Sequence, residues 1–458
     1  MLLLQFFTPK IAHSSYILAG SKSCAVVDPR RDVQIYLDAA KSLNLRITHV
    51  IETHLHADFI SGHMDLAQKT GATIFAPDMG KCAFEHVPVK EGDEIALEDM
   101  ILHVIETPGH TPEHVSYVAI DTSRGSEAAG VFCGDTLFVG DVGRPDLFPG
   151  RARELADALY TSLHEKLLKL PDFCEVYPAH AAGSLCGRAM AAKRQSTIGY
   201  ERRYNSALLI ADRESFISSL TSDMPPAPDH FGRCSAINGK GPALVRSLAV
   251  PVALAPAEFA TQAARDDTVV IDARPYAGFG GQHIADAFSL DLAGNFPTFA
   301  GWIVPPDKDI LLVTTDAAQV PEAVDWLRRV GMDRTVAFLD GGMAAWASAG
   351  LPMRHLPQLS SEELHGVVAA SAGTLVLDTR MPAEYAAGHI RGAVNIPAPD
   401  LRVRHVELEP DAETIVVCST GNRSSLGASM LLQRGFTKVK NVAGGMTGYG
   451  AARFPLDQ

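Results

Sequence analysis

Histidines and an aspartate gather in one short stretch, HVIETHLHADFISGH at residues 49–63. His54, His56 and Asp58 stand at alternate positions within it. They come directly after the apolar run 47–51, which is typical of a short buried strand. Imidazole and carboxylate groups are common protein ligands of zinc and iron. The stretch therefore predicts a metal site where this strand ends.

A cysteine and an arginine form a second candidate site in the run TIVVCSTGNRSSLGASMLLQ. Four residues separate Cys418 from Arg423, and a helical pattern follows. Successive loop amides and the amino end of a helix stabilise an anion, and an arginine adds a positive charge. We expect this loop to favour the thiolate of Cys418. The other members of the loop are Ser419, Thr420, Gly421, Asn422 and Ser424.

The elements that must position the first site alternate between strand and helix. Short β-type runs such as CAVVDP and LHVIET alternate with helical patterns such as VQIYLDAAKSL up to about residue 190. This alternation indicates an α/β domain. Residues 191–250 become polar, then rich in proline and glycine, which indicates a helical extension and a linker. We place the first domain at residues 1–245.

The rest of the chain contains an internal repeat. VVIDARPYAGFGGQHIADAFSL at 269–290 aligns with LVLDTRMPAEYAAGHIRGAVNI at 375–396. Strand-like runs alternate with helical ones in both copies, which predicts two α/β domains with parallel sheets. We place these domains at 250–352 and 356–458.

The two copies differ at the candidate sulfur site. Thr314 stands in the first copy where Cys418 stands in the second, and Gln319 roughly where Arg423 stands. The sequence contains no cysteine between Cys234 and Cys418. The first copy is therefore expected to be inactive, with a role as a spacer, a docking surface or a brace for the metal domain.

Charge and composition argue against several partners. The net charge of −13 disfavours a nucleic-acid partner. No stretch approaches the roughly 20 apolar residues of a membrane span, and the apolar start MLLLQFF lacks a basic segment. The seven cysteines form no CxxC pair, which favours reduced thiols. We expect a cytoplasmic protein that forms homo-oligomers and binds neither nucleic acid nor membrane.

The second candidate site resembles that of the rhodanese sulfurtransferases. The resemblance rests on LDTR, EYAAGHIRGAVNIP, CSTGNRS and GGM between residues 375 and 446, while 250–350 resembles the same fold with an inactive loop. It implies that Cys418 carries a sulfane sulfur as a persulfide and passes it to sulfite or a thiol, with Arg423 assisting. Phosphatases use similar loops with one more residue between cysteine and arginine, so the spacing here favours sulfur.

The first candidate site resembles the metallo-β-lactamase fold, an αββα sandwich, through THLHAD, PGHT, CGDTLF and YPAH in that order. In dinuclear zinc hydrolases of this fold a histidine follows THxHxD, and here that residue is Phe59. His54, His110 and Asp135 remain as two imidazoles and one carboxylate, the facial set of mononuclear Fe(II) sites. The resemblance implies one Fe(II) per chain, surrounded by a further set of polar side chains: His56, Asp58 and His180.

Residues 1 to about 240 most resemble persulfide dioxygenases, which use iron and dioxygen to oxidise a low-molecular-weight persulfide to sulfite. The matching elements are THLHADFISG, TPGHTPEH, GDTLFVGDVGRPD and YPAH. The resemblance implies that Arg144 holds a substrate carboxylate. Glutathione-using relatives follow YPAH with Asp-Tyr, whereas AAGSLCG follows it here, so the carrier thiol stays open. Cys186 in this segment is either a sulfur relay or a packed core residue.

Together the two resemblances imply a sulfide-detoxifying enzyme. The iron site would release sulfite, which would attack the Cys418 persulfide and leave as thiosulfate. Two alternatives stay open. One is a zinc thioesterase of the glyoxalase II type, which would hold two zinc ions. In the other, the rhodanese region is mainly a sulfur-sensing or docking module.

Overall fold

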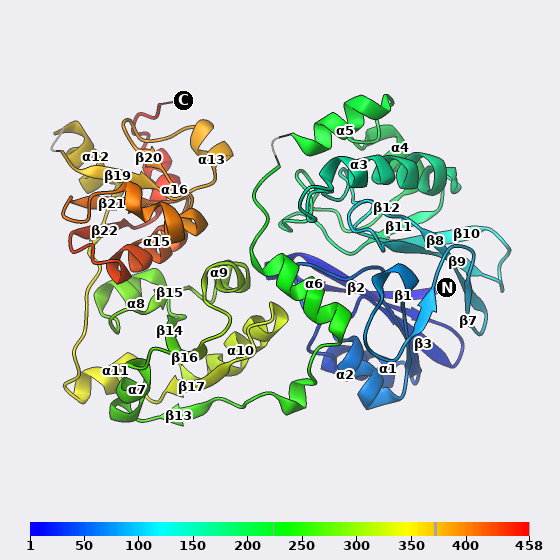
Figure 1. Cartoon of the computed structure of the whole chain (residues 1–458), viewed down its shortest axis with the longest axis horizontal. Coiled ribbons are helices and arrows are strands. Elements are labelled where there is room, and N and C mark those ends of the chain that lie inside the picture. The colour runs from blue at the N-terminus through cyan, green and yellow to red at the C-terminus, as the bar shows by residue number, and fades with distance from the viewer. Residues whose placement is uncertain (223, 371–372, 458) are drawn as a thin grey trace. The chain divides into compact units, whose positions relative to one another are not determined.

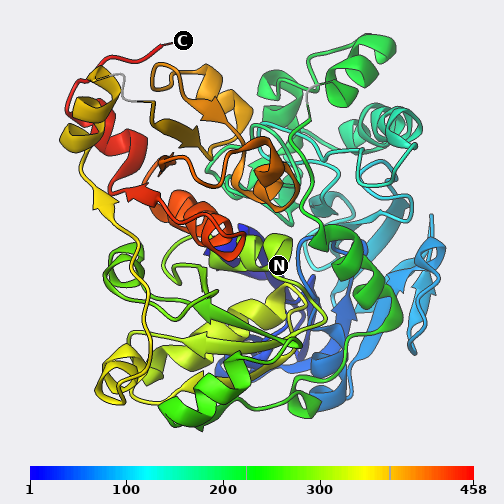
Figure 2. The same cartoon turned by 60° about the vertical axis from the view of Figure 1, so that its left-hand side comes forward.

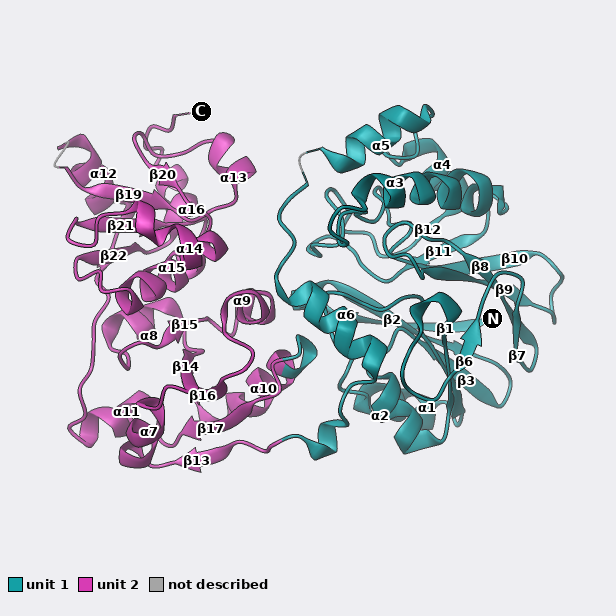
Figure 3. Ribbon diagram, in the orientation of Figure 1, with its two compact units in different colours: residues 1–248, 328–331 teal, residues 249–327, 332–458 magenta. Residues whose placement is uncertain are grey.

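The structure is a computed structural model that describes residues 1–222, 224–370 and 373–457 (Figure 1). The chain divides into two compact units (Figure 3). The first contains residues 1–248 and 328–331, and the second contains residues 249–327 and 332–458. Among the described residues, no helix combines the length and the apolar character needed to cross a bilayer.

Two mixed sheets make up the first unit, each with six strands in the part of the chain that is described. One sheet has β1 (Leu2–Thr8), β2 (His13–Ala19), β3 (Ser23–Val27), β4 (Arg46–Ile51), β5 (Thr73–Pro77) and β6 (Val87–Val89) in sequence order. The other runs in the order β12-β11-β10-β9-β8-β7. Its strands are β7 (Glu94–Leu97), β8 (Met100–Glu106), β9 (Val115–Asp121), β10 (Ala128–Gly134), β11 (Glu175–Pro178) and β12 (Ser196–Thr197).

Three apolar cores join these sheets and their helices into four layers. Leu18 and Val27 of one sheet pack with Leu102 and Tyr117 of the other. A second core packs α1 (Gln34–Ser42) and α2 (His63–Thr70) on the outside of the first sheet. The third packs α3 (Ala152–Thr161) and α5 (Arg213–Thr221) on the second sheet. The αββα sandwich predicted from the sequence is confirmed (Figure 1).

The helical extension predicted after residue 190 contains α4 (Ile198–Tyr204), α5 and α6 (His230–Lys240). Thr197 caps the start of α4, where its hydroxyl accepts the Tyr200 N–H, and Asp212 caps the start of α5, where its carboxylate accepts the Ser215 N–H. These are the side-chain caps that helix starts prefer.

Each copy of the repeat forms a parallel sheet of five strands within the described ranges. The two strand orders, β13-β17-β16-β14-β15 and β18-β22-β21-β19-β20, are the same, so the repeat is confirmed. Figure 2 shows the strands of the first copy, green to yellow, lying next to one another. The strands are β13 (Val252–Leu254), β14 (Thr268–Asp272), β15 (Phe288–Ser289), β16 (Asp309–Val313), β17 (Thr335–Leu339), β18 (Gln358–Leu359), β19 (Leu375–Asp378), β20 (Val394–Asn395), β21 (Thr414–Val417) and β22 (Val439–Val442).

The helices of the two copies follow the strands in the manner of crossover connections. In the first copy they are α7 (Pro256–Ala263), α8 (Tyr276–Gly281), α9 (Phe296–Ile303), α10 (Val320–Arg329) and α11 (Gly342–Ser348). In the second copy they are α12 (Ser361–Ala369), α13 (Pro382–Ala386), α14 (Leu401–Arg404), α15 (Asn422–Gln433) and α16 (Gly445–Ala451).

Strand register shows which residue of the first copy corresponds to Cys418. β14 pairs Asp272 with Val313, and β19 pairs Asp378 with Val417 in the same way. The residues after Val313 and Val417 are Thr314 and Cys418. Thr314 therefore occupies the position of the cysteine, as the sequence alignment predicts.

Candidate functional site

Three buried side chains converge where strands β4, β8 and β10 end. His110 Nε2 lies 3.3 Å and His54 Nε2 lies 3.8 Å from Asp135 Oδ2. Their ligand atoms all lie within 4.8 Å of one another, and all three residues have an exposed fraction of 0%. The structure thus brings together the three residues predicted to bind a metal ion.

The protonation states of His54, His110 and Asp135 allow the three side chains to bind a cation. Burial lowers the pKa of His54 and of His110 below the usual value, so both rings are neutral. Burial would raise the pKa of Asp135, but the charge of His180 and its hydrogen bond hold that pKa well below its usual range. The Nε2 atoms of His54 and His110 are buried and have no hydrogen-bond partner among the described residues. A metal ion would satisfy both atoms, so the residues fit one ion.

The second nitrogen of each imidazole fixes the orientation of its ring. His54 Nδ1 lies 2.9 Å from Thr53 Oγ1, and His110 Nδ1 donates to the main-chain carbonyl of Arg144 at 2.9 Å. Such contacts leave Nε2 as the metal-binding atom. The main-chain N–H of Asp135 donates to His114 Nε2 at 3.0 Å, so His114, to which the sequence analysis gave no role, positions the carboxylate.

Two further predicted residues, His180 and Asp58, lie beside Asp135. His180 Nδ1 lies 2.7 Å from Asp135 Oδ1, and its Nε2 lies 2.9 Å from Asp58 Oδ2. Burial would lower the pKa of His180, but these two carboxylates raise it well above the usual value. His180 is therefore an imidazolium that anchors both acids.

Cys186 belongs to the same buried cluster. Its sulfur lies within 4.8 Å of ligand atoms of Asp58 and His180. Burial raises the pKa of the Cys186 thiol well above its usual value, which keeps it protonated and a poor nucleophile. A sulfur-relay role for Cys186 stays a prediction.

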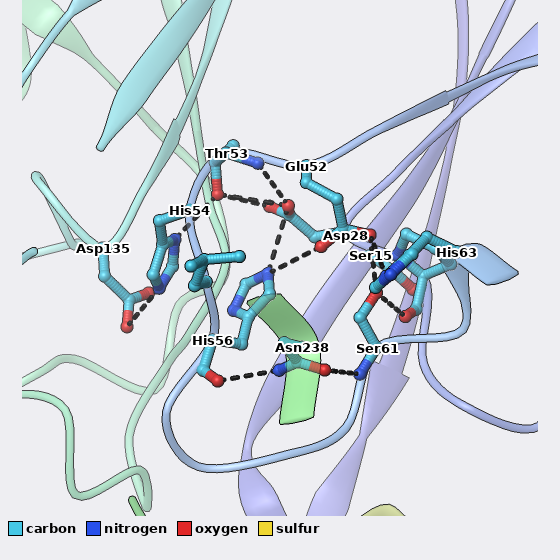
Figure 4. A network of polar contacts seen from close by, with 12 residues as sticks. Ser15, Asp28, Glu52, Thr53, His54, His56, Ser61, His63, Asp135 and Asn238 are labelled. Atoms are coloured by element: carbon cyan, nitrogen blue, oxygen red, sulfur yellow. Dashed lines mark hydrogen bonds and ion pairs between the residues drawn. The ribbon is translucent and has the colours of Figure 1, made fainter. Parts of the chain in front are cut away.

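His56 faces two carboxylates that the sequence analysis did not single out (Figure 4). Its Nε2 lies 3.1 Å from Asp28 Oδ1 and 3.9 Å from Glu52 Oε2. Burial would lower the pKa of His56, but the charge of Asp28 overrides that effect and raises it. Asp28 and Glu52 directly follow the neighbouring parallel strands β3 and β4, and this shared edge was the signal that could have revealed them.

Asp28 is also connected to the candidate metal ligand His54, through hydrogen bonds with Thr53. Asp28 Oδ1 accepts the Thr53 N–H at 2.8 Å, and Oδ2 accepts the Thr53 hydroxyl at 2.9 Å. The same hydroxyl is the partner of His54 Nδ1. One carboxylate therefore orients both histidines of the HLH motif.

We expect Asp28→Asn to weaken metal binding about 10- to 100-fold, the usual effect of losing a partner that orients a ligand. An amide cannot accept both Thr53 donors and balance the charge of His56 as a carboxylate does. The affinity is measured by competition with a chelator for Fe(II) and for Zn(II). Asp38→Asn, the same change at an exposed position of α1, is the control. Equal affinities of the two variants would show that Asp28 does not position the ligands.

Helix α6 of the extension holds the loop that contains the HLH motif. The Asn238 side chain donates to the main-chain carbonyls of His56 and Phe59, each at 2.8 Å, and accepts the Ser61 N–H at 2.9 Å (Figure 4). Phe59 is fully buried, with its ring centroid 4.1 Å from that of His13. The residue in place of a second-metal ligand is thus part of the core.

Arg144 points into the protein. Its guanidinium donates to both carboxylate oxygens of Asp146, at 2.7 and 2.8 Å, and to the main-chain carbonyls of Leu185 and Pro225. Only 2% of its surface is exposed. In this conformation the side chain is a brace, and the predicted contact with a substrate carboxylate would require these bonds to open.

Cys418 lies at the end of β21 and is fully buried. The Gly421 N–H points at its sulfur at 3.1 Å, and the Ser424 hydroxyl does so at 3.3 Å. Gly421 has a φ of 103°, which favours glycine, and α15 begins at the next residue. The loop therefore directs two hydrogen-bond donors at the sulfur.

Arg423 is held by Glu384, to which the sequence analysis gave no role. Nη1 and Nη2 of Arg423 donate to the two Glu384 carboxylate oxygens at 2.6 and 2.7 Å. Ser419 Oγ lies 2.8 Å from Arg423 Nη2 and donates to Glu384 at 2.9 Å. The internal repeat contained a signal that could have linked the two residues, because both are absent from the first copy. There Gly278 aligns with Glu384, and Gln319 aligns with Arg423.

A cavity of about 350 Å³ opens at the Cys418 loop. Both copies of the repeat line it, with Glu384, Ser419, Thr420, Asn422, Arg423 and Leu426 from the second and Ser289, Leu290, Asp291, Gly294, Asn295, Phe296 and Phe299 from the first. A contact between the Ser289 and Ser425 hydroxyls, 2.8 Å apart, also joins the two copies. The inactive copy therefore builds one wall of the cavity at the Cys418 loop.

The matching loop of the first copy is filled by its own side chains. Gln319 Oε1 accepts the main-chain N–H groups of Thr315 and Asp316, at 3.1 and 3.3 Å. Asp316 Oδ1 accepts the Ala318 N–H at 2.8 Å. Because these amides are occupied, they do not form the anion cradle of the second copy.

Comparisons with known proteins divide the chain in the same way, into a first domain and two copies of a second kind of domain. The model of the metallo-beta-lactamase superfamily matches residues 9–180, and that of the rhodanese-like domain matches 255–349 and 361–452. The bovine protein named persulfide dioxygenase ETHE1, mitochondrial, is 32% identical over 240 residues, which are 50% of this chain and 85% of that protein. A hydroxyacylglutathione hydrolase of Rhodospirillum rubrum is 38% identical over 160 residues, 34% of this chain and 57% of the relative.

A solved structure extends the match beyond the first domain. A metallo-beta-lactamase from Staphylococcus aureus is 32% identical with a TM-score of 0.66, and the match covers 74% of this chain and 98% of that one. The likeness therefore includes residues of both units.

Proposed function

Because the first half of this chain belongs to the family of the ETHE1 persulfide dioxygenases, and two rhodanese-like domains follow it, we propose a two-step sulfur oxidation. The first domain oxidises a low-molecular-weight persulfide with dioxygen to sulfite. Cys418 of the last domain then transfers a second sulfane sulfur to that sulfite, which gives thiosulfate.

The observation that carries the first step is the buried set of two neutral imidazoles and one carboxylate. His54, His110 and Asp135 would hold one Fe(II), which supplies the redox chemistry with dioxygen that zinc lacks. His180 fixes Asp135 through a charged hydrogen bond, and Thr53 fixes His54. Phe59 fills the place of the ligand that a second ion would need.

The second step needs only the residues of the Cys418 loop. The Cys418 thiolate attacks the outer sulfur of a persulfide, the S–S bond of the donor breaks, and a thiolate leaves. The sulfur of sulfite then attacks the sulfane sulfur, and the electron pair of the breaking bond returns to Cys418. The donors of Gly421 and Ser424 point at the atom on which that charge forms.

A second candidate function is hydrolysis of a glutathione thioester. The likeness to the hydroxyacylglutathione hydrolase favours it, although the match covers 57% of that relative. A dinuclear site of that kind would have to form without a histidine at position 59.

We expect oxygen uptake with persulfides of glutathione, coenzyme A and cysteine, with no sharp preference for glutathione. The reason is that AAGSLCG replaces the Asp-Tyr pair of glutathione-using relatives after YPAH. Protein purified without oxygen and loaded with Fe(II) is assayed with an oxygen electrode, and sulfite and thiosulfate are resolved. Two zinc ions per chain, with thioester hydrolysis and no oxygen uptake, would establish the hydrolase instead.

A further inference from the structure

The arginine of the Cys418 loop carries its charge in an ion pair. Both terminal nitrogens of Arg423 bind Glu384, at 2.6 and 2.7 Å. Burial opposes ionisation of Glu384, but the hydrogen bonds and charge of Arg423 lower its pKa to about 2. Glu384 is therefore a carboxylate at neutral pH and cancels the charge that an anionic substrate would seek.

The cavity beside this pair is not a basic one. Its charged lining residues, among those described, are Arg423 and the two acids Glu384 and Asp291. The Ser419 hydroxyl donates to Glu384, so this donor of the loop stabilises the Glu384 carboxylate as well. An anion that enters must compete with Glu384 for Arg423 and approach a second carboxylate. Since like charges a few ångströms apart repel, this arrangement disfavours anions in proportion to their charge.

We propose that Glu384 sets the charge preference of the sulfur-transfer site, so that sulfite and acidic thiols are held back and aminothiols are favoured as acceptors. This inference rests on the proposed persulfide on Cys418. In each case the acceptor sulfur bonds to the sulfane sulfur, and the Cys418 S–S bond breaks with its electron pair on Cys418. A thiolate acceptor leaves as a persulfide, and sulfite leaves as thiosulfate.

The test compares acceptors that differ in charge. Cys418 is loaded with glutathione persulfide without oxygen, so that the oxidation step is idle, and excess reagent is removed. Loss of the sulfane sulfur is then followed by intact-protein mass with sulfite, mercaptoacetate or cysteamine. We expect Glu384→Gln to speed discharge by sulfite and mercaptoacetate about tenfold and leave cysteamine unchanged or slower. Added salt should shrink this difference in rate, since the Arg423–Glu384 pair is partly exposed.

Matched variants separate charge from shape. Glu384→Asp keeps the charge and should keep the wild-type order of acceptors. Glu362→Gln removes an exposed charge from the same domain and should change nothing. If Glu384→Gln does not fold, Glu384→Gly takes its place in the test and should show the same faster discharge by sulfite and mercaptoacetate. Glycine is the residue that the first copy carries at this position.

Two outcomes would overturn the inference in different ways. Loaded Glu384→Gln and Glu384→Gly proteins with the acceptor ratios of the wild type would show that Glu384 does not set the preference. Wild-type protein that takes no sulfur on Cys418 would refute the proposed sulfur transfer, and this inference with it.

Discussion

Cys418→Ser should turn the product of the enzyme from thiosulfate into sulfite while oxygen uptake continues. Serine cannot form a persulfide, and in the first copy Thr314 occupies the equivalent position. Sulfur transfer should fall below detection. The measurement is the ratio of sulfite to thiosulfate after a fixed oxygen uptake.

Three comparisons interpret that result. A reaction of sulfite with persulfide in the absence of protein gives the uncatalysed background. Thr314→Ala should behave as the wild type. Arg423→Ala should act in the same direction as Cys418→Ser but less completely, because the donors of Gly421 and Ser424 remain. If Cys418→Ser still makes thiosulfate in the wild-type proportion, Cys418 is not the carrier, and Cys186 becomes the thiol to examine.

His110→Ala should abolish both iron retention and oxygen uptake. The change removes one of the three groups that converge on the proposed ion, and a buried methyl group cannot replace an imidazole lone pair. Iron per chain and oxygen uptake are measured on protein purified without oxygen. Loading of Cys418 with glutathione persulfide should be unaffected, because that site lies in the second unit.

His103→Ala supplies the control for that experiment. His103 lies on β8, partly exposed, and pairs with Glu94. The variant should keep its iron and its activity. A His110→Ala protein that also keeps them would show that the ion is bound elsewhere.

The sequence was informative where chemistry and secondary structure coincide. His54, His110, Asp135 and Cys418 each follow a strand, and strand ends are recognisable from short apolar runs. The alternation of elements likewise predicted an α/β domain, the family resemblance implied the αββα sandwich, and the repeat predicted two domains with parallel sheets.

The residues that the sequence did not reveal act through tertiary contacts. Glu384 reaches Arg423 from helix α13 of its domain, and Asp28 reaches His56 across two neighbouring strands. Acids of this kind are common at strand and helix ends, so their identity alone carries little information. The burial of Arg144 among internal acceptors likewise depends on a chain segment as distant as Pro225.

The contacts of Asn238 determine how much of the chain is needed for a working fragment. The last metallo-β-lactamase motif ends at His180, and a fragment designed on the motifs alone would stop near there. Such a fragment would lack the amide that holds the carbonyls of His56 and Phe59. It would leave those buried groups without a partner in a loop that carries a predicted ligand. The minimal autonomous piece therefore extends through α6, to Lys240 or beyond.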